Sequence, residues 1–113
     1  MKGMMYTQLR HYLNDDDSVP DLPRPAMNLL MFLGSIIGWV SRIPTMQFAS
    51  TNVPCRRNSG RKRCSGEIVA RLLAEDDEIQ WECPVCGDAG VVSNWEGTQW
   101  DKSEDTPPAH TMN

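Results

Sequence analysis

The four cysteines of this 113-residue chain have the residue type and spacing of a metal site. The first two bracket an eight-residue loop, eighteen residues follow, and the last two enclose a Cys-x-x-Cys turn: Cys55, Cys64, Cys83 and Cys86. Four thiolates arranged as a tetrahedron are a ligand set typical of structural zinc. We therefore predict one structural zinc ion bound by all four cysteines.

Other chemistries fit these cysteines less well. The N-terminal residues carry Lys2 and Arg10 where the apolar part of a secretory signal would run, so we expect a cytoplasmic chain with reduced thiols rather than two disulfides. A thiol–disulfide enzyme would place Cys83 at the start of a helix, whereas Gly87 and Gly90 follow this turn. Iron bound by four thiolates stays an alternative to zinc.

A hairpin is needed to bring the two cysteine pairs together. Residues 66–73, 79–83 and 91–95 have strand-like patterns and predict three antiparallel strands. The turn Cys83-Pro84-Val85-Cys86-Gly87 suits a metal-binding knuckle, because proline stiffens it and glycine permits a positive φ. The first two strands are separated by an acidic turn, residues 74–78. Together they fill the connection from Cys64 to Cys83.

Residues 53–101 resemble the zinc-ribbon group. The resemblance depends on Cys55, Cys64 and the run Cys83-Pro84-Val85-Cys86-Gly87-Asp88, with strands on both sides. The final segment, residues 90–101, is similar to a family of small, uncharacterised bacterial zinc-ribbon-like proteins. The resemblance implies a zinc-binding ribbon and attaches no activity to it.

A single apolar helix dominates the N-terminal part of the chain. Pro25 suits the first turn of a helix over 25–42, and residues 26–40 are apolar on every side. A bilayer span needs about 20 apolar residues, and this run is shorter, so we expect no membrane span. Gly34 and Gly38 allow close approach of a second helix or of the rest of the same fold.

We predict from these patterns a small α+β protein with an N-terminal helical segment and a three-stranded antiparallel zinc ribbon. Residues 1–52 form the helical segment with its linkers, 53–101 the ribbon, and 102–113 a disordered tail. We expect the ribbon's small core to contain its tryptophans, with Trp100 the one most exposed.

The loop between the first two cysteines is strongly basic and contains no acid. It invites two interpretations, compensation of the thiolate charge or contact with nucleic-acid phosphates, and its cations are Arg56, Arg57, Arg61, Lys62 and Arg63. Four thiolates leave zinc no open position for water, so we expect no enzyme. We expect instead a non-catalytic adaptor that binds an unknown protein or self-associates through helix 25–42, with nucleic-acid binding by the basic loop as the alternative.

Overall fold

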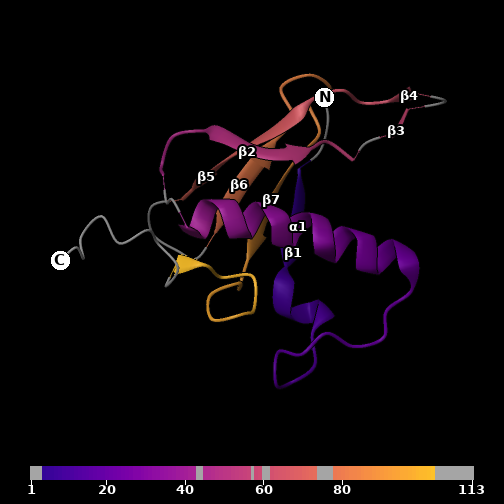
Figure 1. Cartoon of the computed structure of the whole chain (residues 1–113), viewed down its shortest axis with the longest axis vertical. Helices are drawn as coiled ribbons and strands as arrows, with labels where there is room; N and C mark the ends of the chain where they lie inside the picture. Colours follow the sequence, from indigo (N-terminus) through magenta and orange to yellow (C-terminus); the bar gives the residue numbers. More distant parts are fainter. Residues whose placement is uncertain (1–3, 43–44, 57, 60–61, 74–77, 104–113) are drawn as a thin grey trace.

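The computed structural model describes residues 4–42, 45–56, 58–59, 62–73 and 78–103 (Figure 1). One long helix accompanies a sheet of short strands. In chain order the elements are β1 (Met5–Gln8), the 3-10 helix η1 (Leu9–Tyr12), α1 (Arg24–Arg42), β2 (Ala49–Pro54), β3 (Asn58–Ser59), β4 (Lys62–Arg63), β5 (Glu67–Leu72), β6 (Ile79–Glu82) and β7 (Ala89–Ser93). Of the tail predicted over 102–113, all but the first two residues lie outside the described part.

The main sheet has five strands in the order β1-β7-β6-β5-β2, and β3 and β4 form a separate two-stranded sheet. The β5, β6 and β7 strands are antiparallel neighbours, but β2 extends the sheet on one side and β1 joins it in parallel on the other. The predicted three-stranded antiparallel ribbon is therefore wrong: the fold is α+β with a five-stranded mixed sheet. The additional strands are β1, which we assigned to the helical N-terminal segment, and β2, most of which we assigned to its linker.

The helix α1 lies across one face of this sheet (Figure 1). Its sheet-facing side chains are fully or nearly buried: Leu30, Leu33, Ile36, Ile37 and Val40. They meet alternate residues of the strands, Ile68 and Ala70 on β5, Ile79 and Trp81 on β6 and Val92 on β7. Full burial of one Leu or Ile side chain contributes about 1.5–3 kcal/mol, so this layer accounts for the core. Within the described ranges no helix combines the length and apolar character needed to cross a membrane.

The tryptophans of the C-terminal half belong to that core. Trp81 packs edge-to-face against Phe32 of α1, with ring centroids 5.3 Å apart. Trp95 and Trp100 are buried as well, which confirms the core assignment. Trp100 is the most exposed of the three, as expected, but at 9 % it lies inside the fold and not outside it. Trp100 covers α1 at Gly34, so that glycine serves a contact inside the fold.

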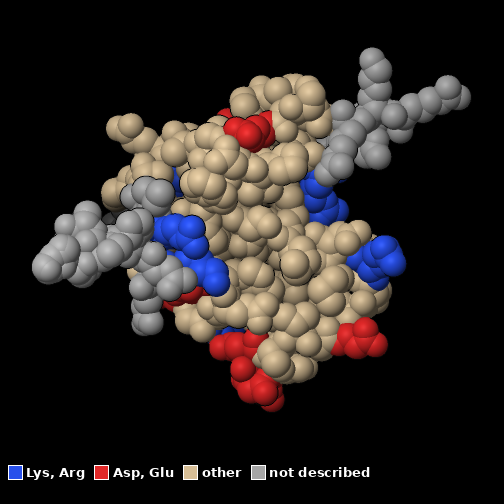
Figure 2. Space-filling model, in the orientation of Figure 1, with Lys and Arg blue, Asp and Glu red and all other residues tan. Residues whose placement is uncertain are grey.

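A groove runs between α1 and the edge strand β2. Its two halves have volumes of about 380 and 470 Å³ and share Ser35, Val53 and Pro54 as lining residues. Arg56 lines one half, and Arg42 and Lys102 line the other. Figure 2 shows basic groups on both sides of the uncharged surface in the middle of this face, with acidic groups mainly at its lower and upper margins.

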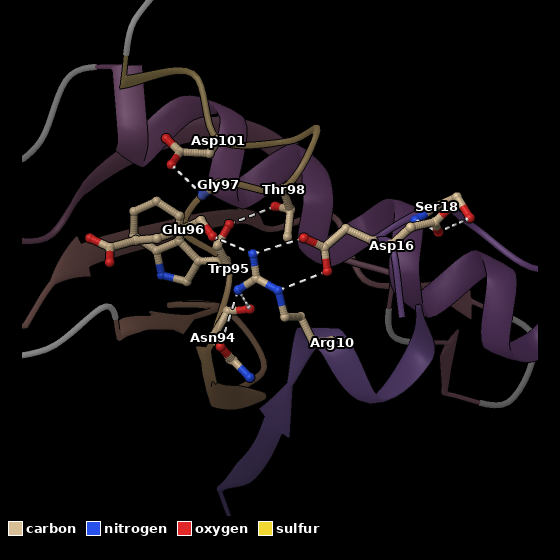
Figure 3. A network of polar contacts seen from close by, with 10 residues as sticks. Arg10, Asp16, Ser18, Asn94, Trp95, Glu96, Gly97, Thr98 and Asp101 are labelled. Atoms are coloured by element: carbon tan, nitrogen blue, oxygen red, sulfur yellow. Dashed lines mark hydrogen bonds and ion pairs between the residues drawn. The ribbon is translucent and has the colours of Figure 1, made fainter. Parts of the chain in front are cut away.

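Arg10 connects the N-terminal elements to the turn after β7 (Figure 3). Its guanidinium donates to both carboxylate oxygens of Asp17 at 2.8 and 3.1 Å. It also donates to the backbone carbonyls of Asn94 at 3.1 Å and Glu96 at 2.6 Å. A planar guanidinium suits several acceptors at once, so one side chain fixes η1 and its following loop against the 94–96 turn.

Candidate metal centre

The sheet register brings the four cysteines to one end of its central strands. Cys55 directly follows β2, Cys64 directly follows β4, and Cys83 directly follows β6. Pro54 pairs with Glu67 at the start of β5, and Glu82 at the end of β6 pairs with Val69 nearby. Residues far apart in the sequence therefore converge because antiparallel partners begin and end at the same edge.

The four sulfur atoms all lie within 4.8 Å of one another. Two of the sulfur pairs join different halves of the motif: Cys55 Sγ lies 3.8 Å from Cys86 Sγ, and Cys64 Sγ lies 3.6 Å from Cys83 Sγ. None of the four cysteines forms a disulfide, and these sulfur–sulfur separations are well beyond the S–S bond length of about 2.05 Å. Four soft sulfur donors this close together could hold one metal ion.

The turn after β6 has the hydrogen bonds of a compact knuckle. Gly87 N–H donates to the Cys83 carbonyl at 2.9 Å, and Cys83 N–H donates to the Asp88 carbonyl at 2.7 Å. Gly87 has φ = 82°, which confirms the positive φ expected at this glycine. A residue with a Cβ would be strained here, so glycine allows the chain to turn back directly into β7.

Gly66 packs against the sulfurs from the other side. Its N–H donates to Cys64 Sγ at 3.3 Å, and its carbonyl accepts the Cys55 N–H at 2.9 Å. A Cβ at this position would overlap Cys83 Sγ and would also lie 3.0 Å from Val85. The absent side chain is thus what lets the β4–β5 connection approach the Cys83 knuckle.

The electrostatics of the knuckle favour a thiolate at Cys83. Burial raises the pKa of this thiol, but N–H groups of Cys86 and Val85 and the neighbouring thiols outweigh burial and lower the pKa to about 7. Thiolates rather than thiols bind metal ions. Backbone amides that point at the sulfur therefore make Cys83 suited to act as a metal ligand.

The basic residues of the first loop are only partly within the described structure. Arg56 is exposed, and its guanidinium carbon lies 5.6 Å from the ring centroid of Phe32. Lys62 and Arg63 form β4, which pairs with β3 as a hairpin; Arg57 and Arg61 lie outside the described residues. Figure 1 shows β3 and β4 extending away from the layer formed by α1 and the main sheet.

Sequence reasoning missed the surface tryptophan Trp39, which is 40 % exposed on α1 and lines the groove. Its position in an almost wholly apolar run concealed it, because most residues of that run look equally suited to burial. The signal that could have found it is helical spacing: Trp39 follows Met31 and Ser35 at intervals of four, and both are exposed.

Comparison with protein families, with curated proteins and with solved structures finds no match to this chain. Of the resemblance to zinc ribbons, the structure therefore supports one feature, a cluster of four cysteines that could hold a metal ion. Functional inference has to start from the cluster and the surface around it.

Proposed function

We propose that this chain is a non-catalytic nucleic-acid-binding protein in which one structural zinc ion fixes a basic hairpin to the sheet. The observation that carries the proposal is the convergence of Cys55, Cys64, Cys83 and Cys86 at the base of that hairpin. Cys55 lies three residues before β3 and Cys64 directly follows β4, so a shared ion would close the hairpin at its root.

The sulfur geometry favours zinc. A tetrahedron with zinc–sulfur bonds of about 2.3 Å has sulfur–sulfur edges of about 3.8 Å. Two of the sulfur pairs are separated by 3.8 and 3.6 Å and all four sulfurs lie within 4.8 Å of one another, so a tetrahedral ion fits with small adjustments of the side chains. Four protein ligands complete the coordination shell and leave no position at which water could be activated, which supports a structural ion.

The hairpin is the surface that favours a nucleic-acid partner. Its segment from Cys55 to Cys64 contains five basic residues and no acid. A tetrathiolate zinc centre carries a formal charge of about −2, so five cations exceed what the centre itself needs. A segment of the sequence this rich in cations, whose described strands β3 and β4 extend away from the main layer, suits contact with phosphates.

The alternative, a protein-interaction adaptor, depended on the apolar helix and the tryptophans. Most apolar residues of α1 pack on the sheet, and Trp95 and Trp100 are buried. These groups are used inside the fold, which weakens the support for an adaptor that binds through them.

Two measurements test the proposal. Native mass spectrometry should find one zinc ion per chain, lost on treatment with a chelator and in each Cys→Ser variant but kept in Ser65→Ala. Electrophoretic mobility shifts with a mixed-sequence oligonucleotide should show binding that weakens steeply with salt. Replacement of all five hairpin cations by Ser should abolish the shift while zinc is retained. Absence of metal would refute the zinc centre, and salt-insensitive or absent binding would refute the nucleic-acid function.

A further inference from the structure

The groove between α1 and β2 continues directly from the root of the hairpin. Arg56, the first hairpin residue after Cys55, lines one half of the groove together with Val53 and Pro54. Arg42 and Lys102 line the other half. From Asn28 at one end to Arg42 at the other, the groove follows fourteen residue steps along α1, or about 21 Å at about 1.5 Å per step. No acidic residue is among its described lining.

We propose that this groove binds single-stranded nucleic acid, with Trp39 as a stacking platform for a base and Arg56, Arg42 and Lys102 facing the phosphates. The inference rests on the proposed nucleic-acid function and adds to it a second surface and the form of the ligand. Cationic grooves with exposed aromatic rings are the common design of single-strand-binding proteins.

The groove has groups that suit the base and the phosphate of a nucleotide. The Trp39 ring is 40 % exposed and lies in the half that also contains the Arg42 and Lys102 cations. The polar side chains of Ser35 and Asn52 line the same half and can hydrogen-bond to base edges. The half volumes of about 380 and 470 Å³ fall in the range of about 300–1,000 Å³ that accommodates small molecules, which is enough for unstacked bases. A duplex keeps its bases stacked inside and would offer the groove only its backbone.

Lys102 is held in place at this surface. Its backbone N–H donates to Ser41 Oγ at 2.8 Å, which attaches the segment after Trp100 to α1. This hydrogen bond keeps the Lys102 cation beside α1, where it lines the groove.

An acidic peptide is the competing occupant, and the edge of β2 disfavours it. An extended peptide would gain affinity by adding a strand to this free edge. The backbone N–H groups of Asn52 and Val53 are instead directed to Ser50 Oγ at 3.3 Å and Thr51 Oγ1 at 3.2 Å. Asn52 has φ = 58°, the β2–β5 register is irregular, and β2 ends in Pro54. These features block strand addition and leave side-chain contacts, which suit a nucleic acid better.

Fluorescence anisotropy with the zinc-loaded full chain tests the inference. The probes are a labelled 12-nucleotide mixed-sequence single strand, as DNA and as RNA, and the corresponding DNA duplex. We expect tighter binding of a single strand than of the duplex, and the better of the two single strands identifies the natural class. Trp39→Leu should weaken single-strand binding roughly 5- to 150-fold. Lys102→Ser should reduce the slope of log affinity against log salt by about 0.7, whereas Arg24→Ser, an exposed cation of α1 outside the groove lining, should not change it.

Each opposite result has a distinct meaning. If Trp39→Leu and Lys102→Ser bind like the parent while the five-Ser hairpin variant loses binding, the groove inference is refuted and the proposed function survives. If no oligonucleotide binds the zinc-loaded chain at low salt, both are refuted. If a Glu-rich peptide binds in a Lys102-dependent manner and nucleic acid does not, the groove is a protein-binding site. Zinc content and near-ultraviolet circular dichroism of every variant verify that the fold is intact.

Discussion

The indole of Trp100 lies directly on Gly34 of α1, where a Cβ would overlap its Cδ1 and Nε1 atoms. The contact joins a helix residue to a residue sixty-six positions later in the chain. Trp100 is held there by the turn that follows β7, in which Thr98 N–H donates to the Trp95 carbonyl and Asp101 N–H donates to the Thr98 carbonyl. The same turn leads into Lys102, so the contact between Trp100 and Gly34 also positions this groove-lining residue beside α1.

Substitution of Gly34 should therefore destabilise the fold. Gly34→Ala should lower the free energy of unfolding by about 1–3 kcal/mol, because the added methyl overpacks a rigid aromatic contact. Gly38→Ala is the matched control on the same helix, since its Cβ would meet Lys102 Cγ and the Trp100 carbonyl oxygen at an ordinary 3.9 Å. It should be neutral or stabilise by up to about 1 kcal/mol through helix propensity. Urea unfolding measures both, and equal stability of the two variants would contradict the close contact.

The sequence predicted the parts of this fold that local pattern determines. Apolar composition and Pro25 indicated a helix over 25–42 within the observed α1, and alternation indicated strands that overlap β5, β6 and β7. The pairing of β1 with β7 was not predictable, because it joins Met5–Gln8 to residues about eighty-five positions away through a strand of only four residues. The β2 strand was concealed by Asn52 and Pro54, residues that read as a linker.

The candidate site, too, has a part that the sequence predicted and a part that it did not. Cysteine spacing identified the four residues whose sulfurs converge, because the ligand types themselves are diagnostic. The groove could not be predicted, since it requires β2 to lie beside α1 and Lys102 to return to the helix through Ser41. Those contacts are set by tertiary packing and leave no local periodicity.

Gly66 should prove essential for metal affinity. Gly66→Ala should weaken zinc binding at least tenfold, because the new Cβ would push Cys83 Sγ away from the other three sulfurs. Ser65→Ala, at the exposed neighbouring residue, is the control and should bind zinc like the parent. Competition with a chromophoric chelator measures the affinities. If Gly66→Ala binds zinc with the affinity of the parent, the sulfurs can rearrange around the new methyl group, and the packing of Gly66 against Cys83 does not limit metal binding.

Arg10 should not be replaceable by lysine. An ammonium group cannot serve Asp17, Asn94 and Glu96 together, so Arg10→Lys should cost about 1–2 kcal/mol of unfolding free energy. The Arg10–Asp17 ion pair is about one-third exposed, and most of this loss should come from the backbone carbonyls of the 94–96 turn. Arg24→Lys, at the exposed start of α1, is the control. Asp17→Asn should cost less than Arg10→Lys in thermal unfolding, and the reverse order would assign the main role to the ion pair.

Asp101 should give the fold a defined dependence on acid. Partial burial raises the pKa of its carboxyl, but N–H groups of Gly97 and Ser103, at 2.9 and 3.0 Å, outweigh burial and hold the pKa below its ordinary 3.8. Because the folded pKa is depressed, this contribution is complete above about pH 4 and is lost as the pH falls through the folded value. Asp101→Asn should thus lower stability by about 0.5–1 kcal/mol at pH 7.

The difference between parent and Asp101→Asn should shrink as the pH falls below 3.8, because the unfolded chain then takes up the proton before the folded carboxyl does. Thermal unfolding at pH 7 and pH 3 measures it, and metal release in acid affects both proteins alike and cancels in the difference. Glu96→Gln is the matched control, since the turn uses the Glu96 carbonyl, which accepts a hydrogen bond from Arg10. A gap between parent and Asp101→Asn that stays constant with pH would mean that the asparagine disturbs the turn by its shape. The carboxylate charge would then have no part in holding Trp100 on Gly34.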